Sequence, residues 1–381
     1  MKNSKPKSNN TIPGTECTLL TMKKAVARRI LLCGPTEYRL PAEQRYILKK
    51  TRIRDTLGTL SEKIFCNGIL ACQQRDVNMP AMTFSKWSPN GNTTLFFPAG
   101  TLTCAQQAHI ASQALQADML GGEQAGFLDM ANKSLRMAGG EFCVNACRAF
   151  GALLAFEAAS AQLGDVPKEA AQTSSETEER HDTIRVSGWQ TPVRLRTRGS
   201  CPHWQVEAVL RLPSLPPPQQ LEPDVFLLRL PGICHVLIEI PDLPTEDYCR
   251  ATAAQLRTRH TLNHESAVGV IWWRKTPRLE MRPLIHVPAI NATYLENACG
   301  SGALALALLL AHNSGQQNFS ILQPGKTTLD VSLSSSNNEH FAAVDGPVSL
   351  LAKGRVWFDI PNIPGSESLS ATEQEKALFT P

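Results

Sequence analysis

The feature that most constrains the fold of this chain is an uninterrupted apolar stretch that follows a turn containing a cysteine. Residues 298–311 read Ala-Cys-Gly-Ser-Gly-Ala-Leu-Ala-Leu-Ala-Leu-Leu-Leu-Ala. Ala and Leu are among the strongest helix formers, and a helix that is apolar on every side must be buried. The sequence therefore predicts a helix inside a protein core, with Cys299 at its amino end.

The amino end of such a helix has a distinct chemistry. The N–H groups of its first turn have no acceptor within the helix, so Gly300 and Ser301 are expected to bind an anion such as a carboxylate. The same field favours the thiolate form of a cysteine. We therefore expect the pKa of Cys299 to be lowered towards neutral pH.

A second stretch of the chain repeats this arrangement. Residues 141–156 place Cys143 directly before another Ala/Leu-rich segment. A single cysteine in such a place is most simply a small buried hydrophobe. Two of them, 156 positions apart and each at the start of a buried helix, favour two similar halves that face each other across a cleft.

The charge is unevenly distributed along the chain. The 381 residues contain 38 Lys and Arg and 34 Asp and Glu, but residues 1–81 alone carry a net charge of +9. The remainder is mildly acidic, which argues against a nucleic-acid partner. Residues 1–81 fit a targeting arm, an arm that binds nucleic acid or a membrane surface, or translated sequence upstream of a natural start at Met79 or Met82. The third reading is favoured, because strand-like sequence begins at once after Met82.

The cysteines and the apolar runs indicate the compartment. Eleven irregularly spaced cysteines in a chain of this length do not form a disulfide framework, and they fit the reducing cytosol. No apolar run reaches the roughly 18 residues of a membrane span, and no signal peptide is recognisable. The expected location is cytoplasmic, with no membrane partner.

The order of sequence patterns predicts two halves. Residues 82–212, completed by 345–361, form the first half, and residues 213–344, which begin with a proline-rich linker, form the second. Residues 1–81 are a basic extension outside the fold, and residues 362–381 are a polar tail. Within the halves, strands are expected at 83–97, 184–197, 204–212, 225–230, 234–240, 267–273, 321–325, 328–333 and 347–358, helices at 105–118 and 245–257, and a solvated insertion at 164–182.

At this point the chain resembles diaminopimelate epimerase over about residues 82–360. Residues 298–303 are similar to that family's second cysteine motif, Ala-Cys-Gly-Thr-Gly-Ala, and residues 143–148 to its first, Cys-Gly-Asn-Gly-x-Arg. Weaker matches are Gly91-Asn92, His235 and residues 345–348. The resemblance implies an α+β fold of two pseudo-symmetric halves, each with a mixed, barrel-like sheet around a central buried helix.

The chain departs from that family at the far end of the substrate. The family places Glu-Arg shortly before the second cysteine, where this chain has Ile290 and Asn291. The arginine holds the distal amino-acid group of diaminopimelate. The chain is therefore more similar to relatives that racemise an ordinary amino acid, such as the histidine racemases of this superfamily.

The resemblance implies an amino-acid racemase or epimerase that needs no cofactor or metal. One of Cys143 and Cys299 would remove the Cα proton as a thiolate, and the other would deliver a proton to the opposite face as a thiol. The α-carboxylate would bind the N–H groups of Val144, Asn145, Gly300 and Ser301 at the two helix ends. Asn92 and His235 are the remaining expected substrate-binding residues. The partner is a small amino acid, and a homodimer is a further expectation.

Other readings of the same residues stay open. Cys143 and Cys299 fit inert core residues as well, and a catalytically silent ligand-binding relative is a further possibility. A metal- or redox-binding protein could use Cys143, Cys147, Cys299 and His235, although nothing nearby completes a usual zinc ligand set. Diaminopimelate epimerase itself is the other alternative enzyme.

Overall fold

A computed structural model describes residues 81–162 and 179–358 of the chain. The sequence expectations for the basic extension up to residue 80, for the polar tail and for most of the insertion at 164–182 lie outside these residues. The described residues form one mixed sheet of 16 strands, in which four α-helices are inserted. None of these helices is both long and apolar enough to cross a bilayer.

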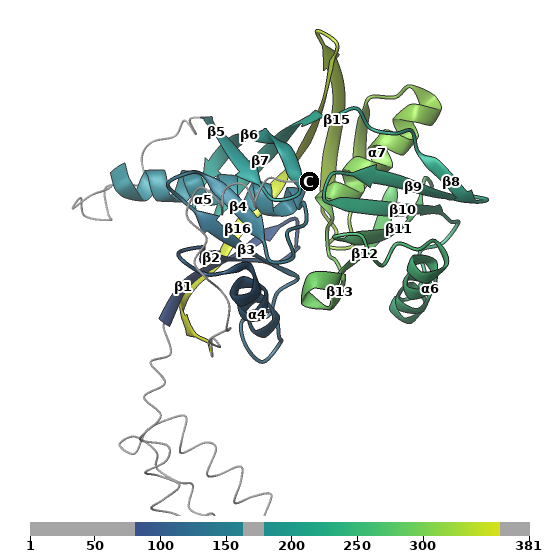
Figure 1. Ribbon diagram of the computed structural model, residues 1–381. Helices are drawn as coiled ribbons and strands as arrows, with labels where there is room; N and C mark the ends of the chain where they lie inside the picture. Colours follow the sequence, from purple (N-terminus) through teal and green to yellow (C-terminus); the bar gives the residue numbers. More distant parts are fainter. Residues whose placement is uncertain (1–80, 163–178, 359–381) are drawn as a thin grey trace, which may run out of the picture. The chain divides into compact units, whose positions relative to one another are not determined.

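The first half is a closed barrel around one helix. Its strands follow one another in chain order, the long β16 pairs with the last of them, and β1 pairs with β16 to close the ring. Helix α5 (Val144–Gln162) lies within it (Figure 1). The strands are β1 (Ala81–Pro89), β2 (Thr94–Pro98), β3 (Gln124–Asp129), β4 (Ser134–Met137), β5 (Arg180–Val186), β6 (Trp189–Ser200), β7 (His203–Leu212) and β16 (Glu339–Trp357).

The second half curves around helix α7 (Gly300–Ser314). Its strands pair in the order β16-β15-β14-β12-β11-β10-β9-β8, and β13 pairs with β12. The strands are β8 (Gln219–Glu222), β9 (Val225–Leu230), β10 (Ile233–Glu239), β11 (Val268–Arg274), β12 (Glu280–Val287), β13 (Ala292–Leu295), β14 (Asn318–Leu322) and β15 (Thr328–Ser336). Strand β16 belongs to both halves, because β7 pairs with one of its edges, while β15 and then β1 pair with successive parts of the other edge.

The two halves repeat one order of elements. Strands β2 and β3 are parallel and joined through α4 (Cys104–Ala114), and β10 and β11 are parallel and joined through α6 (Glu246–Arg259). In the same way α5 connects the parallel pair β4 and β5, and α7 connects the parallel pair β12 and β14. The predicted fold class, with two pseudo-symmetric halves and a central helix in each, is confirmed.

The central helices are buried because their sequences are apolar on every side. In α7 ten residues from Gly300 to Leu310 are buried, and α5 buries Val144, Cys147 and Phe150 completely. By contrast, α4 and α6 bury one face each, which fits their position on the outside of the sheet in Figure 1. The core thus forms around α5 and α7.

The strand predictions were wrong in detail at several places. The strand expected at 184–197 is two strands, β5 and β6, because the chain reverses at Gly188, whose φ of 75° is a turn conformation. Strands β3 and β4 lie in the glycine-punctuated stretch 121–140, where no strand was predicted. Strands β8, β12 and β13 were not predicted either. Four of the five strands missed in this way, β3, β4, β8 and β13, have six residues or fewer, and local sequence carries little signal for strands this short.

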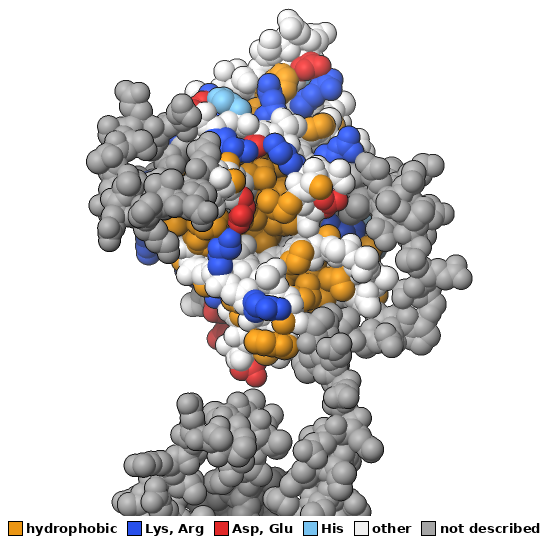
Figure 2. Space-filling model, turned by 90° about the vertical axis from the view of Figure 1, so that its left-hand side faces the viewer, with side chains coloured by type: hydrophobic (Ala, Val, Ile, Leu, Met, Phe, Trp, Pro, Cys, Tyr) orange, Lys and Arg blue, Asp and Glu red, His pale blue; other side chains and the backbone are white. Residues whose placement is uncertain are grey.

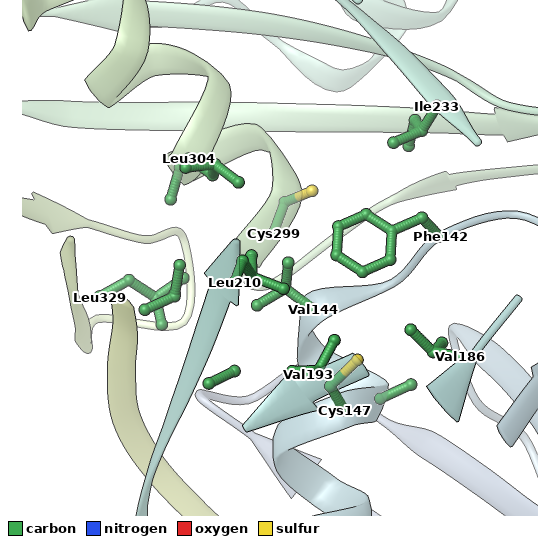
Figure 3. Close-up of a cluster of buried hydrophobic side chains, with 14 of the residues drawn as sticks. Phe142, Val144, Cys147, Val186, Val193, Leu210, Ile233, Cys299, Leu304 and Leu329 are labelled. Atoms are coloured by element: carbon green, nitrogen blue, oxygen red, sulfur yellow. The ribbon is translucent and has the colours of Figure 1, made fainter. Parts of the chain in front are cut away.

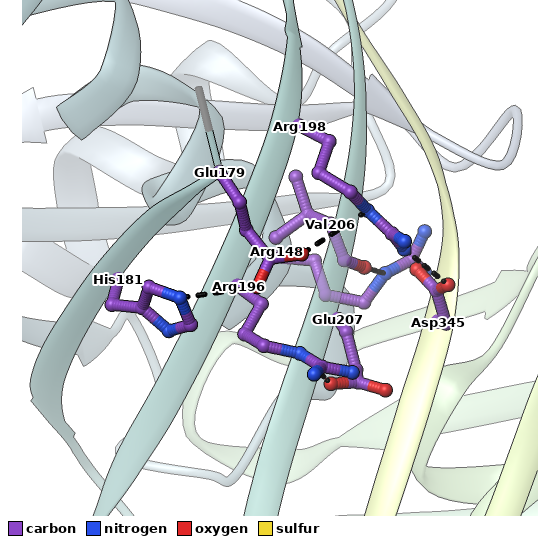
Figure 4. Close-up of polar contacts among 8 residues, drawn as sticks. All are labelled: Arg148, Glu179, His181, Arg196, Arg198, Val206, Glu207 and Asp345. Carbon is purple, nitrogen blue, oxygen red and sulfur yellow. Dashed lines mark hydrogen bonds and ion pairs between the residues drawn. The ribbon is translucent and has the colours of Figure 1, made fainter. Parts of the chain in front are cut away.

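A buried arginine joins α5 to the strands around it. The guanidinium of Arg148 is completely buried, and its Nε donates to the carbonyl oxygen of Val206 at 3.1 Å. Its Nη2 donates to the carbonyl oxygen of Pro347 at 3.1 Å and to Asn90 Oδ1 at 2.5 Å. Nearby, Arg196 pairs with Glu207 and Arg198 with Asp345 (Figure 4). Those partly exposed pairs contribute little stability, whereas Arg148 fixes the orientation of α5 against β7 and β16.

The surface of the first half carries apolar side chains among basic ones. Figure 2 shows a central group of hydrophobic side chains with Lys and Arg side chains around it. In the described residues the large apolar side chains with the greatest exposure are Trp357, Tyr248 and Leu351. The homodimer stays a prediction.

Two hairpin turns, one from each half, meet beside the segment that leads into α5. Gly232 lies between β9 and β10, and a Cβ at this position would be 2.6 Å from Gly188 Cα and 3.0 Å from the Phe142 nitrogen. Both glycines have positive φ. Contact this close requires glycine, so the two turns determine where Phe142, and the Cys143 that follows it, can lie.

We predict that Gly232→Ala destabilises the protein much more than Gly315→Ala. Both glycines have a φ of 73°, but nothing lies within 4 Å of a Cβ at Gly315. The free energy of unfolding of the Gly315 variant should therefore fall by only about 1 kcal/mol, the cost of a left-handed backbone conformation for alanine. At Gly232 overpacking should lower the free energy of unfolding by about 1–3 kcal/mol more. Urea unfolding of both variants measures the difference, and equal losses would show that the two turns do not pack this closely.

Candidate active site

The two central helices begin in the same way. Cys299 is the N-cap of α7, and its Sγ accepts a hydrogen bond from the backbone N–H of Gly302 at 3.3 Å. Cys143 precedes α5, and its Sγ accepts from the N–H of Ala146 at 3.3 Å. Each sulfur thus satisfies one of the N–H groups that a helix leaves free at its start.

Both cysteines line one pocket. Figure 3 shows the sulfur of Cys299 at the end of α7, with the side chains of Phe142 and Ile233 near it. Residues from both halves contribute to the pocket, so it lies where the halves meet. Its lining also includes Asn145, Gly300 and Ser301, the apolar residues Ala125, Ile285, Val287 and Ile290, and the polar residues Glu123, Gln124, Glu141, Tyr294 and Glu296.

The carbonyl group directly before Cys299 is held by two side chains of the first half. Asn92 Nδ2 donates to the carbonyl oxygen of Ala298 at 3.1 Å, and Asn145 Nδ2 donates to the same oxygen at 2.9 Å. Asn145 lies in the first turn of α5, two residues after Cys143. The backbone next to one cysteine is therefore bonded to the helix that begins at the other.

Further hydrogen bonds strengthen this connection. Glu123 of the first half accepts from Asn92 Nδ2 at 3.0 Å and from the backbone N–H and side-chain amide of Asn297 at 3.1 and 2.8 Å. The N–H of Cys299 donates to Gln323 Oε1 at 3.0 Å. The bonds of Glu123 fix the amino end of α7 against the first half, and the bond of Gln323 fixes it within the second half.

The two helix starts are in direct contact. A Cβ on Gly300 would lie 2.8 Å from the Cβ of Val144 and 3.0 Å from Asn145 Oδ1. Such distances are shorter than real Cβ contacts, so glycine at position 300 permits the close approach. The first turns of α5 and α7 thus face each other.

The structure brings together most of the residues expected to form the site. Cys143, Cys299, Asn145, Gly300 and Ser301 line the pocket. Asn92 and Val144 lie next to it in the contacts just described, but they do not line it. The part that each plays in substrate binding stays a prediction.

His235 lies behind the pocket rather than in its lining. Its side chain is completely buried, and neither ring nitrogen has a hydrogen-bond partner among the described residues. Burial lowers the pKa of His235 to about 3, so the ring is neutral. The neighbouring strand leaves room for it, because a Cβ on Gly269 would fall 2.2 Å from His235 Nδ1. A direct contact of this ring with substrate stays a prediction.

Several lining residues were missed by the sequence reasoning. Gln124, at the start of β3, accepts a hydrogen bond from the Cys143 thiol at 2.8 Å. Glu141 and Glu296 precede the two cysteines by two and three positions. The glutamate shortly before each cysteine is visible in the sequence and could have indicated acidic residues in the pocket. The position of Gln124, by contrast, depends on β3, a strand that the sequence did not predict.

The expected lowering of the thiol pKa was wrong. Burial, and then the negative charge of Glu296, raise the pKa values of both Cys143 and Cys299 well above the usual range. The hydrogen bonds from Ala146 and Gly302 act in the opposite direction but are smaller contributions. Both thiols are accordingly protonated in this pocket at neutral pH.

The pocket also contains carboxyl groups with raised pKa values. Burial, and then the neighbouring Glu123, raise the pKa of Glu296 to about 8, although hydrogen bonds with Cys299 and Asn92 oppose the shift. Burial raises the pKa of Glu141 to about 7. Groups with pKa values near neutrality are suited to accept and release protons.

The described residues contain no group of three or more His, Cys, Asp or Glu side chains arranged to hold a metal ion. Cys143, Cys147, Cys299 and His235 are therefore not gathered as ligands. Cys147 instead packs in the apolar core around α5 (Figure 3).

Comparison with known proteins identifies similar sequences and folds. The chain is 25% identical over 286 residues to a histidine racemase of Fusobacterium nucleatum, covering 74% of this chain and 99% of that protein. It is 22% identical over 301 residues to a histidine racemase of Staphylococcus aureus, covering 74% and 100%. Among solved structures, a hydroxyproline epimerase from Agrobacterium vitis aligns with a TM-score of 0.46 and 11% identity, covering 74% of this chain and 94% of that one.

A family model described as the histidine racemase CntK N-terminal domain matches residues 81–357. This range extends from the first described strand to the end of β16 and so includes both halves and the pocket between them. The chain, an isomerase of the amino-acid racemase class, belongs to the histidine racemase CntK N-terminal domain family.

Proposed function

We propose that this protein is a cofactor-independent histidine racemase in which Cys143 and Cys299 exchange protons with the Cα of the substrate. The observation that carries the proposal is that two cysteines, each capping the start of a buried helix in one half, line the same pocket. Inversion at Cα needs proton transfer on two opposite faces, and groups from two facing helices can supply it. The names of the similar racemases support histidine as the substrate.

The α-carboxylate would bind at the facing helix starts. The N–H groups of the first turns of α5 and α7, at Val144, Asn145, Gly300 and Ser301, point towards an anion at these positions. Negative charge moves onto the carboxylate as the Cα proton leaves. The same N–H groups would therefore stabilise the transition state more than the bound substrate.

The proposed sequence of proton transfers starts from two protonated thiols. In one direction of reaction, the Cys299 thiol gives its proton to the neighbouring Glu296 carboxylate, which forms a Cys299 thiolate and a neutral Glu296 carboxyl group. The positive α-ammonium group of the substrate favours that thiolate. The thiolate then takes the Cα proton, and the Cys143 thiol delivers its own proton to the other face. Reversal of these two transfers returns the original enantiomer.

The pocket supports this chemistry over its alternatives. Pyridoxal phosphate enzymes hold their cofactor on a lysine, and the lining of the described pocket contains no lysine. The lining also contains no arginine to hold the distal carboxylate of diaminopimelate, and Ile290 occupies one of the two positions at which that family has Glu-Arg. The substrate is therefore an ordinary amino acid in this proposal.

The test is incubation of the purified protein with L-histidine in deuterated water. We expect deuterium at Cα and formation of D-histidine, both unaffected by EDTA and without added pyridoxal phosphate. Activity that EDTA abolishes and zinc restores would contradict the proposal. Exchange with L-diaminopimelate and not with histidine would favour the alternative enzyme.

The serine variants of the two cysteines should each lose racemisation. A hydroxyl group is a much weaker acid than a thiol, so it cannot supply the base, and positioned general acids and bases contribute roughly 100- to 10,000-fold to rates. We expect kcat to fall by a factor in that range for Cys143→Ser and for Cys299→Ser. Cys147→Ala, one helical turn after Cys143 and outside the pocket lining, is the matched control and should keep its activity. A serine variant with the turnover of the control would remove that cysteine from the mechanism.

The rate should rise with pH through the neutral range. The Cys299 thiol can lose its proton only when Glu296, whose pKa is raised to about 8, is ionised. Below that pKa the ionised fraction increases about tenfold per pH unit, so kcat/KM should increase nearly as steeply from pH 6 to pH 7.5. Glu296→Gln should lower the rate and flatten this part of the profile. A wild-type profile that is already flat at pH 6 would show that no group with this pKa controls the reaction.

A further inference from the structure

The pocket contains three glutamates, and they differ in how their carboxyl groups are bonded. Glu123 accepts hydrogen bonds on both oxygens, from Asn92 and Asn297. Glu296 is hydrogen-bonded to Cys299 and Asn92. Glu141 Oε2, in contrast, is buried and has no partner among the described residues. Of the three, only Glu141 has a fully buried carboxyl oxygen with no partner among the described residues, and that oxygen can receive a donor from a ligand.

The position of the Glu141 carboxyl group is fixed by its surroundings. The backbone N–H groups of Gly139 and of Glu141 itself donate hydrogen bonds to the carboxyl group. Ser187 Oγ donates to the Glu141 carbonyl oxygen at 3.0 Å, which holds the backbone in place. A buried oxygen without a partner costs free energy of about 1–3 kcal/mol. A ligand that donates to this oxygen would remove that cost.

The Glu141 carboxyl group lies on the apolar side of the pocket. A Cβ on Gly139 would fall 2.7 Å from Glu141 Oε2 and 2.5 Å from Val287 Cγ1, so Gly139 packs against both. Val287 belongs to the apolar part of the lining, with Ile285 and Ile290 from the second half. An apolar wall with one acceptor is suited to a flat, mostly apolar ring that carries an N–H group.

We propose that Glu141 is the specificity residue that accepts a hydrogen bond from a side-chain N–H of the substrate and so selects an imidazole. This rests on the proposed function, since it assumes that the pocket holds an amino acid between the two cysteines. Carboxylate side chains are rejected, because they would bring two acceptors together in a buried site. Aliphatic side chains bind more weakly, because they leave Oε2 without a donor.

The pKa of Glu141 is close to that of an imidazole ring, the group that it is proposed to bind. Burial raises its pKa to about 7, and free imidazole has a pKa of about 6.5. One proton can therefore be shared between the two groups near neutral pH without a buried net charge. Arg136, whose positive charge opposes the rise of the Glu141 pKa, keeps some ionised carboxylate available as the acceptor.

The experiment measures binding, which does not depend on turnover. Calorimetric titration would compare L-histidine with its two ring-methylated forms, Nπ-methyl- and Nτ-methyl-L-histidine. Each methyl group removes the donor at one ring nitrogen. With the wild-type protein, the methylation that removes the donor to Glu141 should raise Kd roughly 10- to 100-fold, as expected for a hydrogen bond to a charged group.

The same titrations with Glu141→Gln test the residue. Glutamine has the same shape, and its carbonyl oxygen can keep the hydrogen bonds from the backbone. We expect Kd for L-histidine to rise roughly 10- to 100-fold and the difference between histidine and the sensitive methylhistidine to disappear. Glu157→Gln, an exposed carboxylate farther along α5, is the matched control and should bind like the wild type. Thermal unfolding of each variant reports on folding.

Other results would overturn the inference and are distinct from failure of the proposed function. If Glu141→Gln binds all three ligands more weakly by the same factor, Glu141 contacts the α-ammonium group or acts structurally. If both methylhistidines bind the wild type as tightly as histidine, no ring N–H is recognised, whether or not the variant folds. A wild type that binds histidine with this selectivity but exchanges no Cα proton would refute the racemase proposal alone, and one that binds no histidine would refute both.

Discussion

The meeting of two helix starts is the constraint on which the rest of this structure depends. Gly300 at the beginning of α7 lies against Val144 at the beginning of α5, closer than any side chain at position 300 would allow. Two asparagine side chains of the first half then hold the carbonyl oxygen of Ala298. Since both cysteines lie within two residues of these contacts, their relative position is set by the close approach of the two helix starts and by two buried asparagine side chains. The two barrel-like halves of the sheet thus bring the amino ends of two buried helices together.

The sequence predicted the parts of this arrangement that depend on local chemistry. The Ala/Leu runs after Cys143 and Cys299 predicted both buried helices, because helix propensity and uniform apolarity are local properties. The small residues at 300–302 predicted the tight start of α7. The family resemblance pointed to Asn92 as a substrate-binding residue, but its bond to Ala298 could not be predicted, because the two residues are 206 positions apart and meet only when the two halves are assembled. Gln124 was missed for a different reason, since it lies only 19 positions from Cys143 but its bond needs β3, a strand that the sequence did not predict, beside the start of α5.

The error in the thiol pKa has a similar origin. A cysteine at a helix start is a local feature and predicts a lowered pKa. Burial and the charge of Glu296 are not local, and in this structure they are larger than the effect of the hydrogen bonds from Ala146 and Gly302. The glutamates beside the cysteines were visible in the sequence, but their effect depends on a dry pocket that only the assembled halves create.

A raised thiol pKa also has a chemical advantage. The Cα–H of an amino acid is a very weak acid, and a thiolate with a higher pKa is a stronger base towards it. The disadvantage is that less of the thiolate forms at a given pH, which a nearby group must offset. In the proposed mechanism, Glu296, with a pKa of about 8, holds the displaced proton within the pocket, while the helix N–H groups would stabilise the charge that develops on the substrate carboxylate. The same dry surroundings that make the thiolate scarce thus make it reactive, and on this reasoning Glu296 is as necessary to the proposed chemistry as the sulfurs themselves.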